Sequence, residues 1–425
     1  NDAGAARPTA LARPTRAYSL GTGEFLLVDS GANSVGRVDS AGVARRLISE
    51  FIIDPQNVPD GYQANETLKL SGPRDAVTWT EVAVLGSNPV FTNQQPVEYW
   101  VHTLIADGGN NRLVQLVDRY GYDVASSRVL EPITVANVPQ LGVLRWHSPA
   151  SISGREFSYN SLSRVFVPGT VSTPARYVYV AGIGNTLPTN TGVGLDTSGA
   201  GDPLPSGGGN GGVVILDPAN PRYVQVINQL AVPDWSGTPV WFDAANGTGQ
   251  FISAASLGDP RLINRRLGAT RLMSNVTSVT ARVVQVAGNP VVMVMVSDAN
   301  GVFEFPLPSG TSTVGGVTWM MPTDVYRGIR PIFARNVAST EDKNPENFRP
   351  MYAKRMSNGE VLIVNGYFGR RRNGNNFYGE VVQINPTFYD LAAENLGFRI
   401  SSISYELGPI QGTRGLVQPI FADRR

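Results

Sequence analysis

Three consecutive arginines followed by two aromatic residues form the densest group of chemically capable side chains in this sequence. Arg370, Arg371 and Arg372 share one short segment with Phe377 and Tyr378. Guanidinium groups bind carboxylates and phosphates through paired hydrogen bonds, and aromatic rings stack on arginine or on sugars. The segment therefore predicts an interaction site, with glycan binding as one use and a solvated loop tip as the alternative.

Residues for acid–base, thiol or metal chemistry are scarce. The chain has 0 Cys and 2 His, which are His102 and His147. Thiolate metal sites, disulfides and cysteine nucleophiles are therefore excluded, and a site of several histidines is nearly so. Each histidine stands near a tryptophan, and we expect both to pack against aromatic rings rather than to act as catalytic bases. We predict no catalytic residue, no metal ligand and no cofactor.

Polar turns separate apolar runs at several places in the chain. Asp and Asn side chains hydrogen-bond to the nearby backbone and Gly supplies positive φ, so such turns favour hairpins. The residues that we assign to these turns are Asp29, Asp107, Asn110, Asn111, Arg112 and Asn365. We interpret them as structural, and a recognition edge is the alternative for the group from 107 to 112.

The turns belong to a repeat that runs along most of the chain. Each copy has an apolar run, a turn rich in Asp, Asn and Gly, and a second apolar run, which predicts a β-hairpin. The first apolar runs end at positions 29, 107, 181, 297 and 365. Shorter strands precede some copies, as in 13–24 and 349–360, and candidate outer strands lie at 43–48, 223–230, 316–321 and 398–407. Four antiparallel strands per copy are typical of a propeller blade.

The copy from Ala106 to Val114 resembles the NHL repeat, whose central signature is an apolar strand, Asp, Gly and Asn residues, Arg and a second apolar strand. The resemblance implies an all-β protein, a β-propeller whose faces serve as protein-interaction platforms. The long gap between the third and fourth copies leaves room for one more unit, around 237–257 or 262–286. We therefore predict six blades of four antiparallel strands with long insertions, and two stacked β-sandwich domains as the alternative fold.

The domain organisation that we predict is an extended arm, 1–14, followed by a single propeller domain, 15–425. Four long insertions interrupt it, at 49–72, 131–146, 184–211 and 329–348. The third is rich in Gly, and loops of this length are usually functional or disordered. We expect the insertions and the arm to rest on the propeller itself or on a neighbouring subunit. The segment 416–422 is expected to be a strand near the point of ring closure.

Charge and hydropathy limit the partners of the protein. The formal net charge is +1, so no overall field attracts nucleic acid. No apolar run approaches the roughly 20 residues of a membrane-spanning helix. The small, polar residues at the start resemble a mature terminus left after signal-peptide removal, so we expect an extracellular or periplasmic protein.

The function that we predict is non-catalytic: an exported binding or structural protein that engages protein partners or copies of itself in a filament, sheath or envelope. The alternative is a calcium-dependent, lactonase-like hydrolase or another propeller hydrolase. Resemblance to six-bladed lactonases implies a metal held by Glu, Asn and Asp at a central channel, and no motif assigns these residues. Glycan binding through the Arg370 segment is a weaker alternative.

Overall fold

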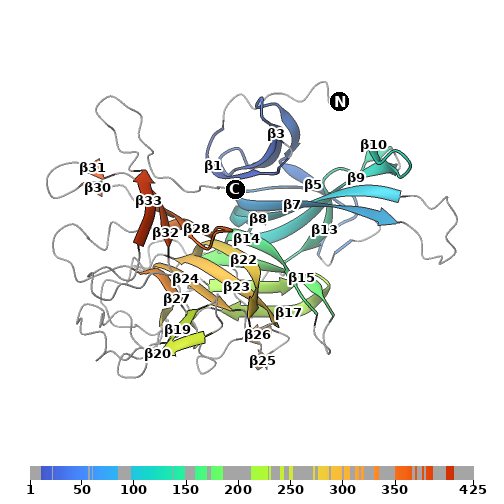
Figure 1. Ribbon diagram of the computed structural model, residues 1–425. Helices are drawn as coiled ribbons and strands as arrows, with labels where there is room; N and C mark the ends of the chain where they lie inside the picture. The colour runs from blue at the N-terminus through green and yellow to red at the C-terminus, as the bar shows by residue number, and fades with distance from the viewer. Residues whose placement is uncertain are drawn as a thin grey trace. The chain divides into compact units, whose positions relative to one another are not determined.

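The part of the chain that this computed structural model describes is built of β-strands (Figure 1). It covers residues 11–21, 23–55, 58–59, 61–84, 97–135, 137–148, 158–169, 174–184, 212–227, 229–230, 240–243, 248–251, 271–272, 276–286, 289–298, 301–306, 312–314, 317–319, 330–334, 350–365, 369–370, 376–377, 380–385 and 399–405. Within these ranges the one helical element is a 3-10 turn, η1 (Gly108–Asn110), and no helix is long and apolar enough to cross a membrane.

The chain divides into two compact units, residues 1–150 and 151–425, and each is described by itself. The predicted single domain, 15–425, stays a prediction. The predicted arm lies mostly outside the described residues. Its last part is held by the first unit, because the backbone N–H groups of Ala12 and Arg13 donate to the carboxylate of Asp29.

The first sheet of the first unit is a simple meander. Its four strands pair antiparallel in chain order. They are β1 (Pro14–Ser19), β2 (Glu24–Asp29), β3 (Ser34–Asp39) and β4 (Ala44–Ile48). The outer strand β4 confirms the expected strand at 43–48.

The second sheet contains the same antiparallel meander with additions. The meander strands are β7 (Pro73–Val84), β8 (Val97–Asp107), β9 (Arg112–Asp123) and β13 (Val143–His147). The additions are β5 (Glu50–Ile53), β6 (Thr67–Lys69) and β10 (Arg128–Pro132), and β11 (Thr134–Val135) pairs with β12 (Val138–Pro139) beside them. Because β5 pairs parallel to β13, it covers the outer edge of the meander. The expected insertions 49–72 and 131–146 are thus largely built into this sheet.

The second unit holds three more four-stranded meanders. The third sheet has β14 (Ser158–Val167), β15 (Arg176–Gly184), β16 (Gly212–Asp217) and β17 (Asn220–Ile227). The fourth has β22 (Val276–Val286), β23 (Asn289–Asp298), β24 (Gly301–Pro306) and β27 (Arg330–Ala334). The fifth has β28 (Pro350–Arg355), β29 (Val361–Asn365), β32 (Glu380–Asn385) and β33 (Arg399–Tyr405).

Short strands complete the second unit. Strand β26 (Val317–Trp319) pairs parallel to β17 and antiparallel to β25 (Ser312–Val314). Three further pairs join β18 (Gln229–Leu230) to β21 (Arg271–Leu272), β19 (Val240–Asp243) to β20 (Thr248–Phe251), and β30 (Gly369–Arg370) to β31 (Asn376–Phe377). The segment 316–321, expected as the outer strand of the fourth copy, was wrongly assigned, because it extends the third sheet and β27 takes the outer position.

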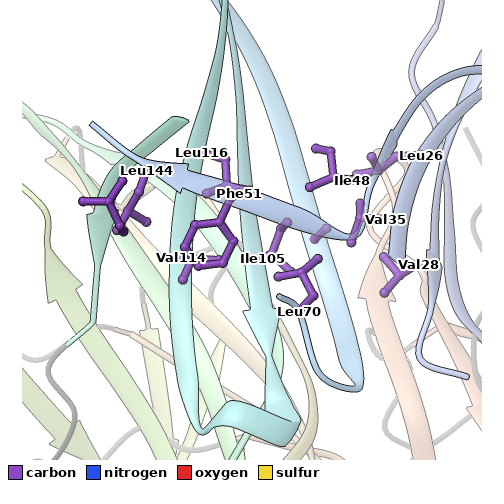
Figure 2. Close-up of a cluster of buried hydrophobic side chains, with 12 residues drawn as sticks. Leu26, Val28, Val35, Ile48, Phe51, Leu70, Ile105, Val114, Leu116 and Leu144 are labelled. Carbon is purple, nitrogen blue, oxygen red and sulfur yellow. The ribbon is translucent and has the colours of Figure 1, made fainter. Parts of the chain in front are cut away.

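Within each unit, successive sheets pack face to face through apolar side chains. In the first unit, Leu26, Val28 and Ile48 of the first sheet share one cluster with Ile105, Val114, Leu116 and Phe51 of the second (Figure 2). These side chains form one continuous core. In the second unit, valines of β15 and β16 pack in the same way against valines of β22 and β23. Burial of β-branched side chains on both facing sheets is the main source of stability in such packing.

The fourth sheet is covered on more than one side. One face packs on the third sheet, and the Ala353 N–H of β28 donates to Ser278 Oγ of β22 at 3.2 Å. In the second unit, three sheets packed in series do not fit a domain of two sheets, so the alternative fold of two stacked β-sandwich domains does not describe this unit. The series is consistent with a β-propeller. The described residues hold five four-stranded meanders, so six blades are not confirmed. The hairpin of β19 and β20 lies where one extra unit was expected.

All five meanders share one irregularity near the start of the first strand. The pairing register shifts between Pro14 and Arg16 in β1, and between Pro73 and Asp75 in β7. The register also shifts near the start of the other three first strands. The shift lies between Tyr159 and Ser161 in β14, between Val276 and Ser278 in β22, and between Pro350 and Tyr352 in β28. A bulge at an equivalent position in every sheet indicates that the sheets are true repeats of one unit. Proline is tolerated there because the first residue of a strand need not donate to the ladder.

Candidate interaction surface

The predicted turn at 107–112 forms a closed network of hydrogen bonds. The carboxylate of Asp107 is fully buried and accepts from the Ser71 backbone N–H at 2.7 Å and from Asn110 Nδ2 at 2.8 Å. Arg112 Nε donates to the same carboxylate at 2.9 Å. Asn111 adopts the left-handed conformation, φ 52°, that ends η1 and starts β9. Asp107, Asn110, Asn111 and Arg112 therefore lie together in one turn.

The guanidinium of Arg112 is occupied by the segment that carries β5 and β6. Nη2 donates to the Lys69 carbonyl at 3.2 Å, Nη1 donates to the Tyr62 hydroxyl at 3.4 Å, and the group lies 5.1 Å above the Phe51 ring. Each of its nitrogens thus has an acceptor within the chain. These contacts anchor the segment on the second sheet. Since the guanidinium of Arg112 is already bonded within the chain, it does not offer donors to a partner, as the recognition-edge alternative would require.

Asp29 plays the corresponding part in the first sheet. Besides Ala12 and Arg13, the N–H groups of Gly31 and Ala32 donate to its carboxylate. Burial alone would raise the pKa of Asp29, but the four backbone hydrogen bonds outweigh it and hold the pKa below the ordinary value. The turn therefore fixes the start of β1 with an ionised carboxylate.

The glycines of these turns serve close packing, which corrects the expected reason for their presence. Positive φ is supplied by Asn33 and Asn111, each at 52°. A Cβ on Gly31 would lie 2.9 Å from the Ala12 Cβ, and one on Gly109 would lie 2.6 Å from the Ser71 carbonyl oxygen. Only glycine lets each turn approach so closely the segment that leads into the first strand of its sheet.

We expect the substitution Gly109→Ala to lower the free energy of unfolding by about 1–3 kcal/mol, because backbone must move to admit the methyl group. Gly36→Ala is the matched control, since its Cβ would meet no atom closer than 3.5 Å. Urea denaturation of both variants checks the difference. Equal stability of the two variants would contradict the packing explanation.

The predicted arginine–aromatic segment is described only in part. Arg370 ends β30 and pairs with Asn376, and Gly369 pairs with Phe377 in β31. Arg371, Arg372 and Tyr378 lie outside the described residues. Asn365 ends β29 opposite Pro350, the place that Asp29 takes opposite Pro14. An interaction site at this segment stays a prediction.

Both histidines pack against aromatic rings. His102 is buried and stacks on Trp79 at 4.9 Å between ring centroids, with Gln115 Nε2 3.0 Å from its Nδ1. His147 meets the Tyr62 ring edge-on at 5.1 Å, and its Nδ1 lies 2.8 Å from the Ser148 carbonyl oxygen. In the described part of the chain, no three His, Asp or Glu side chains gather in a way that could hold a metal.

A projecting part of the second sheet, which sequence reasoning missed, is the best candidate for an interaction surface. Strands β7, β8 and β9 have 12, 11 and 12 residues, whereas β13 has 5 and pairs with β9 only from Val114 to Val117. The far ends of the three strands therefore extend past β13, together with β10 (Figure 1). We call residues 80–84, 97–100, 119–123 and 128–130 the wing.

One face of the wing is charged and internally paired. Arg119 donates to both carboxylate oxygens of Glu98, each at 2.8 Å, and Trp100 Nε1 donates to Glu98 at 2.6 Å. The hydrogen bonds with Glu98 raise the pKa of Arg119 despite its burial. Arg145 lies 5.5 Å above the Trp100 ring. These groups already have partners and form a rigid base for the wing.

The other face of the wing is apolar. Register places eight side chains on it, namely Thr80 and the seven valines and tyrosines Val82, Val84, Val97, Tyr99, Tyr120, Tyr122 and Val129. Val82 is 49% exposed and Val84 is 61% exposed. The rings of Tyr99 and Tyr122 stack with centroids 6.0 Å apart. Alternation of Val and Tyr with polar residues was the available signal in the sequence, but it did not show which side chains stay uncovered.

The described geometry defines an all-β protein of repeated, face-packed four-stranded sheets with one projecting apolar surface. No known sequence family and no curated protein matches the chain. Among solved structures, Kuenenia stuttgartiensis hydrazine synthase is similar over 89% of this chain and 78% of its own, with 10% identity and a TM-score of 0.29. Drosophila Semaphorin 1a, extracellular domains 1–2, is similar over 89% and 87%, with 9% identity and a TM-score of 0.27. Both TM-scores lie below 0.5, so neither likeness bears on fold or function.

Proposed function

We propose that this chain is a non-catalytic protein-binding scaffold of the β-propeller type, which acts as a structural component of an extracellular assembly. The observation that carries the proposal is the apolar face of the wing, where Val82 and Val84 stay about half exposed. A contiguous uncharged surface rich in tyrosine and valine is typical of the centre of a protein interface.

The propeller part of the proposal is supported by the repeated unit. Each described meander has four antiparallel strands and the same bulge in its first strand. Within each unit, neighbouring sheets pack face to face, as blades do. The Asp107–Arg112 turn, which carries the resemblance to the NHL repeat, holds an insertion in place.

Native mass spectrometry of the protein isolated gently from its source tests this function. We expect particles heavier than the 45.6 kDa chain, without a stoichiometric metal ion. A monomer carrying one calcium ion per chain, with hydrolysis of lactone substrates, would overturn the proposal in favour of the hydrolase alternative. Fractionation of the cells in the same experiment tests the extracellular location.

A further inference from the structure

The apolar face of the wing continues an interface that already exists inside the first unit. Side chains alternate along β8, so Tyr99 points to the same side as Ile105. Ile105 is buried in the core between the first and second sheets (Figure 2). The first-sheet strands have only 5 or 6 residues, and no side chain of the wing belongs to the core that they form with the second sheet. Around Ile105, this face of β8 is therefore covered by a β-sheet, namely the first sheet.

The absence of charge on the apolar face limits which kind of β-sheet could cover it. The eight side chains of the apolar face include no acid and no base, while Glu81, Glu98 and Arg119 stand on the opposite face. Packing a charged surface on the apolar face would desolvate ions without partners, which is costly. An uncharged sheet face is therefore required, and a second wing supplies one.

We infer that two copies of this chain pair through their wings, apolar face to apolar face, around a two-fold axis. This inference rests on the proposed scaffold function and names its partner as a second copy. In an isologous contact each patch meets its own equivalent, so the valines of one wing pack on the tyrosines and valines of the other without burying a charge. Tyrosine hydroxyls can stay hydrated at the rim of such a contact.

The size of the wing sets the strength of the pairing. Eight side chains per copy fall short of the roughly 20–30 residues per side of a standard stable interface. The isolated pair is therefore weak and depends on protein concentration. Such a contact suits an assembly in which several weak contacts act together.

Single cysteines give the most direct test, because the chain has 0 Cys. We expect Val82→Cys, Val84→Cys or Val129→Cys to form a disulfide-linked dimer of the purified full-length chain under mild oxidation, and Leu47→Cys to stay monomeric. Leu47 is a matched control, because its side chain is 49% exposed, as is that of Val82. The neighbouring Arg46 contacts Asp118 of the second sheet, so by strand alternation Leu47 points to the opposite face of β4. Cross-linking at Leu47 and at none of the wing positions would overturn the inference.

A charge in the wing supplies a second test. Sedimentation velocity over a series of concentrations should show self-association of the natural chain, and Val84→Lys should weaken it about tenfold or more, or ~1.4 kcal/mol. Leu47→Lys should leave it unchanged. Persistent association of the Val84→Lys variant would place the contact elsewhere and overturn the wing pairing.

The outcomes separate this inference from the proposed function. If the purified chain stays monomeric at every concentration and no wing cysteine cross-links, the pairing is overturned. The particle isolated from the native source then still decides whether the chain is a scaffold, because its mass would include a different protein. A metal-bearing, catalytically active monomer in that preparation would overturn the scaffold function instead.

Discussion

The substitution Glu304→Gln is expected to lower the free energy of unfolding of the second unit by about 3–5 kcal/mol, the range for breaking a buried ion pair by removing one partner. The side chain of Glu304 is 1% exposed and lies between two arginines. Arg282 Nη2 is 3.1 Å from Oε1, and Arg355 donates through Nε to Oε1 at 3.0 Å and through Nη2 to Oε2. Glutamine would turn an amide N–H₂ toward these donors.

The loss is large because the triad joins two sheets. Glu304 belongs to β24 of the fourth sheet and Arg355 to β28 of the fifth, and Arg355 is only 8% exposed. Without the carboxylate, a nearly buried guanidinium loses its counter-charge. Urea denaturation followed by tryptophan fluorescence and circular dichroism measures the change. Arg45→Met is the control, since Arg45 is 56% exposed and its pair with Asp39 should contribute little.

The same triad predicts that stability depends on pH. Burial alone would raise the pKa of Glu304, but the hydrogen bonds and charges of Arg355 and Arg282 outweigh it and hold the pKa below its ordinary value of 4.5. A lowered pKa in the folded state contributes stability above the unfolded pKa, and this contribution is lost as pH falls through the folded pKa. The stability difference between the natural chain and Glu304→Gln should therefore be full at neutral pH and shrink below pH 4.5. A constant difference across that range would contradict the assignment of the effect to the ionised carboxylate.

The strand pattern could be predicted from local sequence, while strand partners could not. Runs ending at Asp29, Asp107 and Asn365 close strands β2, β8 and β29, because alternation and turn residues act within a few positions. Val317 to Trp319 also has the composition of a strand. This strand pairs with β17, where its Val317 lies opposite Val224, far away in the sequence. The residues around Val317 do not indicate whether the strand joins the third sheet or the fourth.

The candidate site illustrates the same limit. The residues of the turn from Asp107 to Arg112 were identified from their types, since each makes its hydrogen bonds over short distances. The wing was missed because its exposure depends on a comparison between sheets. Val82 and Tyr99 alternate like core residues, and only the shorter strands of the first sheet leave them uncovered. The alternation of side chains along the sequence predicts which residues share a face of a strand. How much of that face is buried depends on the size of the neighbouring sheet.

Removal of the carboxylate of Asp107 is expected to have an effect as large as that of Glu304, in the first unit. Asp107→Ala would leave the partly buried Ser71 N–H without its acceptor and would deprive Arg112, whose side chain is 14% exposed, of its counter-charge. We expect a loss of about 3–5 kcal/mol. Hydrogen exchange should also rise in β5 and β6, because the contacts of Arg112 with Lys69 and Tyr62 hold that segment.

A double substitution separates the ion pair from the rest of the turn. If Arg112 destabilises the Asp107→Ala variant through its unpaired charge, adding Arg112→Met should recover part of the loss, and the two effects should not be additive. Asp107→Asn should be intermediate, since its amide oxygen can still accept from the Ser71 N–H while its amide nitrogen faces Asn110 and Arg112. A loss below about 1 kcal/mol for Asp107→Ala would mean that the turn is held by backbone geometry alone. The insertion would then be bound through β5 and its parallel pairing with β13 rather than through the Asp107 turn.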